Sequence, residues 1–267
     1  MNAPGKGPPP DASSSRSPAS FTQPPGVATT LSATSGHESF LSTDHLAALT
    51  ATAVVCGVLP LAARTHPGRW TRVVARGLAV LLIAWVAAYH LVVALRGQFE
   101  PDFDLPLHLT DIVTVIAALA LWSRSPLLFE LTYFWGLTAV LLAVLTPGLD
   151  PEEGFPSFFF WHYFITHSGV VLAALFLAFG LRMTARSGAV RRVFLATLAW
   201  AGVATAGNIF TGGNYMFLRE RPETPSILDY MGPWPWYILS ATLLALTLFA
   251  LLDLPFRARR ERAFDPL

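Results

Sequence analysis

Cysteine and lysine are almost absent from this chain. Cys56 is the single cysteine and Lys6 the single lysine among 267 residues. One cysteine excludes an intramolecular disulfide and a metal cluster held by several thiolates. The lack of a lysine in any apolar stretch excludes a retinal Schiff base, and the lack of a Gly-Lys-Ser/Thr loop argues against an ATP-driven pump subunit. Charged residues are also few, at 13%, whereas soluble domains contain roughly 25%.

Hydrophobic residues make up 53% of the chain and gather in runs long enough to cross a bilayer. A membrane-spanning helix needs about 20 mainly apolar residues. Seven such runs predict an all-α, polytopic membrane helix bundle with seven transmembrane helices. Their approximate ranges are His45–Ala63, Val73–Leu95, Leu105–Trp122, Pro126–Leu145, Phe158–Leu181, Val193–Thr211 and Pro235–Leu252.

Charge alternates between the connections of these spans. Thirteen of the 18 basic residues fall after the first, third and fifth spans and in the C-terminal tail. The remaining connections collect most of the acidic residues. By the positive-inside rule, this alternation predicts an N-terminus outside and a C-terminus in the cytoplasm. The pattern is that of a multi-pass cell-membrane protein, expected in a bacterial inner membrane.

The chain ends differ in composition from the spans. Proline, serine, glycine and threonine dominate residues 1–43, which bury too little apolar surface to offset the entropy of ordering. We therefore predict a disordered tail at 1–43, a seven-helix transmembrane domain at 44–255 and a basic cytoplasmic tail at 256–267. The net charge of +1 and the lack of a basic stripe argue against nucleic acid as a partner.

Ionisable residues lie inside the apolar spans, near the end that faces outward. They are His90, His108, His162 and His167, with Asp111 beside them. Ionisable groups are costly in lipid, so those that occur there usually face a protein cavity. The sequence therefore predicts a polar pocket on the extracytoplasmic side.

Helix periodicity indicates which of these side chains lie on the same face of a helix. His108 and Asp111 are three residues apart and share a face. His162 and His167 diverge by about 140° on an ideal helix, so both reach one pocket only if it is wide or the helix is distorted. Glu130 lies apart, near the inner surface, and is expected to contact a helix N-terminus or headgroup water.

Several segments together resemble the YwaF-like family of bacterial integral membrane proteins. The resemblance covers roughly residues 45–255, and its most specific parts are the Leu-Pro-Leu-His segment and the Pro-Trp-Pro-Trp run. The matching segments are 105–111 (LPLHLTD), 133–136 (YFWG), 145–147 (LTP), 155–157 (FPS) with His162 and His167, 214–215 (NY) and 226–237 (SILDYMGPWPWY).

That family is distantly similar to a eukaryotic membrane protein that acylates ether lysophospholipids, and to the androgen-induced membrane hydrolases of fatty-acid esters. The resemblance implies an intramembrane threonine or cysteine nucleophile and a distant histidine, which are Thr110 and His167 here. Many family members carry cysteine where this chain has Thr110. Threonine is the nucleophile type that the hydrolase relatives imply.

The first hypothesis is therefore an intramembrane lipid acyltransferase or esterase that needs no cofactor. Thr110 attacks an ester carbonyl, His167 takes its proton, and His108 or Asp111 orients the base or holds the proton of the oxyanion. Membrane lipids are the expected partners, with a lipid or acyl substrate. The loop Gly212–Pro233 can fold over the pocket mouth. Candidate substrate-binding residues are His162, Asn208, Asn214, Tyr215 and Trp135.

Two alternatives stay open at this point. Histidines with Asp111 can bind zinc and activate a water, as in a metal-dependent seven-span hydrolase. Against this, the seventh span carries no histidine, whereas that group places metal ligands there. The pocket can also belong to a non-enzymatic protein that binds or transports a lipid or small molecule, with histidines as pH-sensitive contacts.

Overall fold

The computed structural model describes residues 42–149, 153–223 and 226–264, so residues 1–41 of the predicted disordered tail lie outside the described residues. Within the described ranges every regular element is a helix. The elements are α1 (Thr43–Thr65), α2 (Arg69–Leu95), α3 (Leu109–Ser123), α4 (Pro126–Trp135), η1 (Gly136–Val140), α5 (Leu141–Leu145), α6 (Phe158–Leu175), η3 (Phe176–Gly180), α7 (Ala189–Thr211), η4 (Tyr215–Phe217), η5 (Ile227–Tyr230) and α8 (Trp236–Phe264).

The predicted polytopic helix bundle is confirmed. In the described part of the chain, six helices are long and apolar enough to cross a membrane, and α3 is a shorter apolar helix of 15 residues. The third predicted span, Leu105–Trp122, therefore starts too early, because residues 101–108 form turns and α3 begins only at Leu109. At the other end of the chain, α8 extends through the predicted basic tail as far as Phe264.

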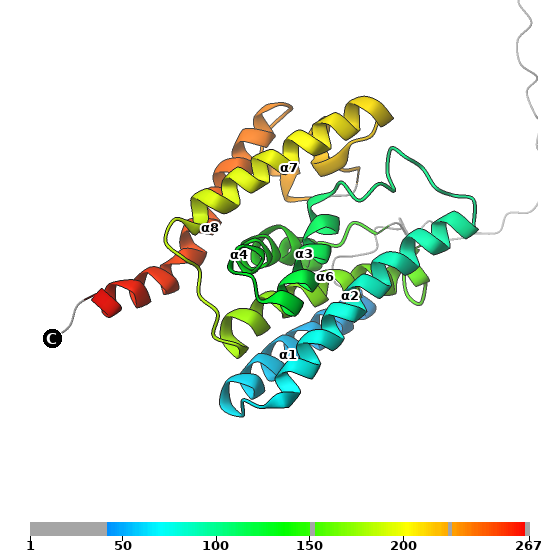
Figure 1. Cartoon of the computed structure of the whole chain (residues 1–267). Coiled ribbons are helices and arrows are strands. Elements are labelled where there is room, and N and C mark those ends of the chain that lie inside the picture. The colour runs from blue at the N-terminus through cyan, green and yellow to red at the C-terminus, as the bar shows by residue number, and fades with distance from the viewer. Residues whose placement is uncertain (1–41, 150–152, 224–225, 265–267) are drawn as a thin grey trace, which may run out of the picture. The chain divides into compact units, whose positions relative to one another are not determined.

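Two continuous helices occupy the middle of the bundle. The span formed by α4, η1 and α5 is 61% buried and the span formed by α6 and η3 is 67% buried, compared with 11–22% for the other four. Figure 1 shows α3, α4 and α6 between the α1–α2 pair and the α7–α8 pair. Helix α3 packs on α2, α4 and α6, so its first turn faces the centre of the bundle.

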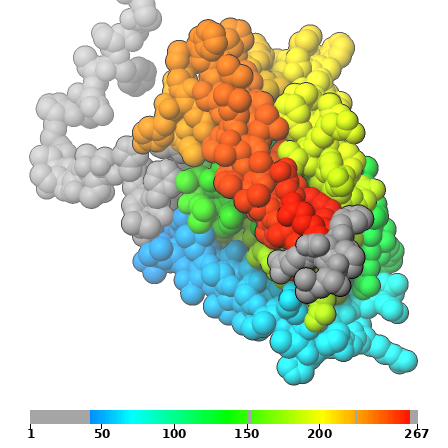
Figure 2. All heavy atoms as spheres, turned by 90° about the vertical axis from the view of Figure 1, so that its left-hand side faces the viewer, coloured from blue at the N-terminus to red at the C-terminus, as the bar shows by residue number. Residues whose placement is uncertain are grey.

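The outer helices present apolar side chains to their surroundings. Val73 on α2 is 70% exposed and Phe210 on α7 is 87% exposed. Figure 2 shows α8, in orange to red, along one face with α7, in yellow, beside it. Large exposed apolar surfaces suit contact with lipid rather than water. The protein is thus a multi-pass membrane protein.

Local sequence signals set where the helices of the site begin. Ser157 caps α6, since its hydroxyl accepts a hydrogen bond from the amide of Phe160 at 3.0 Å. Helix α3 begins after His108, whose amide donates to the carboxylate of Asp111 at 3.0 Å. Capping of this kind satisfies amides that have no partner inside the helix. These two helix starts place the histidines of both segments at the same end of the bundle.

The far end of the bundle holds an ion-pair cluster around Glu130. Its side chain is fully buried and accepts hydrogen bonds from the guanidinium groups of Arg186 and Arg192, at 2.8–3.0 Å. It also accepts the main-chain amide of Arg186 at 2.9 Å, just before α7 begins. Nearby, Asp253 is held by Arg257 and Arg260. The apolar setting favours such pairing, because an unpaired buried carboxylate is costly.

Candidate functional site

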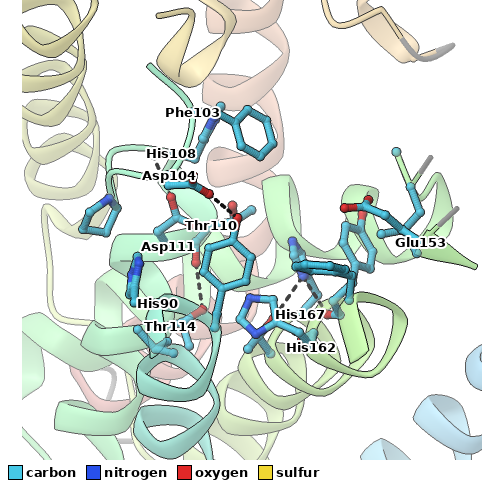
Figure 3. A pocket seen from close by; sticks show the side chains of 18 of the residues that line it. His90, Phe103, Asp104, His108, Thr110, Asp111, Thr114, Glu153, His162 and His167 are labelled. Carbon is cyan, nitrogen blue, oxygen red and sulfur yellow. Dashed lines mark hydrogen bonds between the residues drawn. The ribbon is translucent and has the colours of Figure 1, made fainter. Parts of the chain in front are cut away.

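A cavity of about 210 Å³ lies at the end of the bundle opposite this cluster. Residues of the connections between α2 and α3 and between α5 and α6 form part of its lining, and Figure 3 shows 18 of its residues. The predicted residues Thr110, Asp111, His108, His162 and His167 all line it, as does His90. Additional polar lining residues are Tyr89, Asp104, Thr114, Glu153, Tyr163 and Thr166.

Helix α6 brings both of its histidines to the cavity despite their angular separation. The α6 residues of the lining fall at 159, 162, 163, 166 and 167, which is the spacing of one broad helix face. His162 and His167 stand at the two edges of this face. The wide pocket that the sequence required for their convergence is therefore present.

The hydroxyl groups of the cavity differ in how they are used. Thr114 donates to the carbonyl of Thr110 at 2.8 Å, and Thr166 donates to the carbonyl of His162 at 2.7 Å. Tyr163 donates to the carbonyl of Ala143 at 2.7 Å.

Tyr89 donates to a carboxylate oxygen of Asp104 at 2.6 Å. Of the hydroxyls that described residues contribute to the lining, only that of Thr110 has no hydrogen-bond partner among the described residues. Among the described lining residues, Thr110 thus has the one hydroxyl that is free to bind a ligand.

The ring of His167 is held in one tautomer. Its Nδ1 lies 2.8 Å from the carbonyl oxygen of Tyr163, and the ring stacks on that of Tyr163 with centroids 4.1 Å apart. A carbonyl oxygen can only accept, so Nδ1 carries the proton. The Nε2 atom then keeps a lone pair, which is the form that a general base requires.

Asp111 has a structural contact in this arrangement. One of its carboxylate oxygens accepts the amide of His108, which caps α3. The contact fixes the first helical turn, and Thr110 lies in that turn. The catalytic role that we predict for Asp111 stays a prediction.

His108 joins this first turn to the loop that follows α7. Its Nδ1 accepts the amide of Met216 at 3.3 Å, and its ring contacts those of Tyr215 and Phe217, with centroids 5.2 and 5.4 Å away. Burial lowers the pKa of His108 to about 4, because a charged imidazolium is poorly solvated there. The neutral ring is the form that can accept from Met216.

This contact predicts a loss of stability in acid. The unfolded chain protonates His108 near its ordinary pKa, whereas the folded protein does so only near pH 4. Between these values the unfolded state binds more protons, so stability is complete above about pH 6.5 and falls as the pH drops toward 4. His108→Asn keeps an acceptor near the Nδ1 position but does not titrate. Thermal unfolding in detergent at pH 7.5 and 4.5 should show a smaller drop for this variant, and an equal drop in both proteins would contradict the assignment.

Four of the predicted substrate-binding residues lie outside the cavity lining. Asn208 and Tyr215 are buried and exchange two hydrogen bonds, from the amide of Tyr215 at 2.6 Å and from the Asn208 side chain at 3.1 Å. Asn214 organises its own loop through Arg219 and Glu220. Trp135 is buried and donates to Thr197 at 2.8 Å. Their contacts here are structural, and a role in substrate binding stays a prediction.

A model of the TMEM164 family matches residues 40–253, which is most of the chain and all but the last turns of the bundle. The chain belongs to the TMEM164 family. An uncharacterised protein of Treponema pallidum (strain Nichols) is 28% identical over 154 residues, which are 58% of this chain and 63% of that relative. No solved structure matches the chain. The YwaF-like assignment and the similarity to acyltransferases and hydrolases stay predictions.

In this TMEM164-family chain, sequence reasoning missed the Tyr89–Asp104 pair, which forms one wall of the cavity. Asp104 is almost fully buried, and its second carboxylate oxygen accepts the amide of Glu100 at 2.7 Å. Tyr89 lies near the end of one span and Asp104 lies 15 residues later, in the next connection. This spacing does not match the period of a helix, so the sequence does not indicate that the two side chains pair. Only the folded chain shows that the two side chains meet.

The metal-dependent alternative lacks a ligand set in the described part of the chain. No three His, Cys, Asp or Glu side chains of these residues converge closely enough to hold a metal ion. The histidines of the cavity are spread along its walls, and their nearest contacts are aromatic rings and main-chain groups.

Proposed function

We propose that this protein cleaves or transfers the acyl groups of membrane lipids, with Thr110 as nucleophile and His167 as general base. The observation that carries the proposal is the unpartnered hydroxyl of Thr110 in a cavity where the other described lining hydroxyls are committed. A threonine hydroxyl is a weak nucleophile and needs a neighbouring base to become reactive. The free Nε2 of His167, in the same cavity, is suited to that role.

The position of the cavity favours a lipid as substrate. It lies between membrane-spanning helices and is lined by Val86, Leu105, Leu149 and Phe159 as well as by polar groups. An ester at the boundary between acyl chain and headgroup has the same mixed character. A lipid can therefore place its carbonyl near Thr110 while its chain contacts apolar walls.

The chemistry proceeds in two balanced steps. The Thr110 oxygen attacks the ester carbonyl and passes its proton to Nε2 of His167. The bond from the carbonyl carbon to the alcohol oxygen then breaks, and the departing alcohol takes the proton back. An acyl group now esterifies Thr110, and a second molecule with an O–H group releases it by the reverse sequence.

A fluorophosphonate probe tests the nucleophile directly, since it forms a covalent bond with an activated hydroxyl. The protein in lipid nanodiscs should take up one equivalent of probe, and peptide mapping should place it on Thr110. Heat-denatured protein serves as the control and should not react. Labelling of another residue, or equal labelling of native and denatured protein, would remove Thr110 from the mechanism.

A further inference from the structure

One nitrogen of His162 is buried without a partner. The Nδ1 atom makes no hydrogen bond with any described residue, and it is the one buried side-chain nitrogen or oxygen of the described residues in this condition. Burying a polar atom without a partner costs about 1–3 kcal/mol. Because His162 lines the cavity, a bound molecule can supply the missing hydrogen bond there.

The surroundings of His162 fix the position of its ring. The ring stacks on Tyr89 with centroids 4.7 Å apart and planes inclined by 27°, and it stacks on Phe158 at 6.3 Å. When the neutral ring carries its proton on Nε2, the buried Nδ1 is a hydrogen-bond acceptor.

Two imidazole nitrogens of the cavity, Nδ1 of His162 and Nε2 of His167, have no hydrogen-bond partner among the described residues. A molecule that donates to both nitrogens needs two polar hydrogens. Water is the smallest molecule with two O–H hydrogens, whereas a simple alcohol has one. A cavity of about 210 Å³ also has ample room for a water, whose share of liquid volume is about 30 Å³.

We infer that His162 positions the water that releases the acyl group from Thr110, which makes this protein a hydrolase. The inference rests on the proposed function and adds the second substrate. One O–H of the water is held by Nδ1 of His162, and the other passes its proton to Nε2 of His167 while the oxygen attacks the acyl carbon. The bond to the Thr110 oxygen breaks, and His167 returns the proton to that oxygen. His162 keeps its protonation state and is a positioning residue.

Two substitutions separate the nitrogens of His162. The side-chain nitrogen of glutamine reaches the place of Nε2, so His162→Gln keeps a polar group at that place and removes the acceptor at Nδ1. The amide of asparagine reaches the place of Nδ1, so His162→Asn keeps a polar atom facing the cavity. The two variants form a matched pair, because both replace the imidazole ring with an amide.

The experiment follows p-nitrophenyl butyrate turnover by nanodisc-embedded protein in water alone and with added 1-hexanol. The initial burst reports formation of acyl-Thr110 and also shows that each variant is folded. The steady state and the ratio of hexyl butyrate to butyrate report release to alcohol and to water. An alcohol needs only His167 as base, so its reaction does not use Nδ1 of His162.

For His162→Gln we expect a burst that still approaches one equivalent per protein, hydrolysis at least about tenfold slower, and a product ratio shifted at least about tenfold toward hexyl butyrate. His162→Asn should retain more hydrolysis. An unchanged product ratio in His162→Gln would overturn the water-positioning role, as would equal losses of hydrolysis and hexanol transfer. Absence of a burst from wild-type protein would instead overturn the proposed function, and the inference with it.

Discussion

Replacing Thr110 by valine is expected to lower the rate of ester cleavage by about 10³-fold or more. Valine has nearly the shape of threonine, so the first turn of α3 and its capping contact between His108 and Asp111 should persist. The change removes the one lining hydroxyl of the described residues that has no acceptor. The acyl group then has no oxygen to which it can be transferred. The measurement is the initial rate of p-nitrophenyl butyrate cleavage by purified protein in nanodiscs.

Thr114→Val is the matched control for this variant. Thr114 lies one turn further along α3 and lines the same cavity, but its hydroxyl is used on the carbonyl of Thr110. A hydroxyl that bonds the preceding helical turn contributes little to chemistry. We expect a rate within about threefold of wild type. Equal losses in the two variants would mean that the cavity tolerates no change at this helix and that Thr110 has no special role.

His167→Gln should slow the same reaction by about 10²–10⁴-fold, which is the usual contribution of a general base. The glutamine amide fills the place of the ring and can still hydrogen-bond, but it cannot take a proton from Thr110. Because the two residues act together, the Thr110→Val, His167→Gln double variant should be no slower than Thr110→Val alone. Additive losses in the double variant would show that the two side chains act independently.

His90→Gln provides the comparison for His167→Gln. His90 lines the same cavity, and its ring packs edge-on against Tyr89, with centroids 5.4 Å apart. It makes no hydrogen bond through its side chain to another described residue. A loss well below that of His167→Gln is expected. A comparable loss of rate would indicate that His90 and His167 contribute equally to ester cleavage. The tautomer that the Tyr163 carbonyl fixes would then not explain the effect of His167→Gln.

The helical bundle could be predicted from the sequence because a run of about 20 apolar residues in a membrane satisfies its backbone hydrogen bonds best as a helix. The third span was the exception. The apolar content predicted that this span begins at Leu105, but Tyr215 holds residues 101–108 as turns by accepting the amide of Leu105 and donating to the carbonyl of Pro101. Contacts between residues more than 100 positions apart cannot be predicted from the apolar content of one segment.

The candidate site was predictable to a similar extent. Costly histidines in apolar runs correctly indicated a polar cavity, since such residues seldom face lipid. Which of its hydroxyls donate hydrogen bonds inside the protein was not predictable, because this depends on which carbonyl each side chain reaches. Likewise, nothing local distinguishes Asn208, which bonds Tyr215, from a residue that lines the cavity.

Peptide mapping of protein quenched with acid during turnover of p-nitrophenyl butyrate tests the central claim most directly. Cleavage at the arginines yields one peptide, residues 97–124, that contains Thr110. We predict a butyryl group on Thr110 in this peptide, at higher occupancy in His162→Gln and absent from Thr110→Val. A butyryl group on any other residue, or turnover that continues with Thr110 unmodified, would contradict the account.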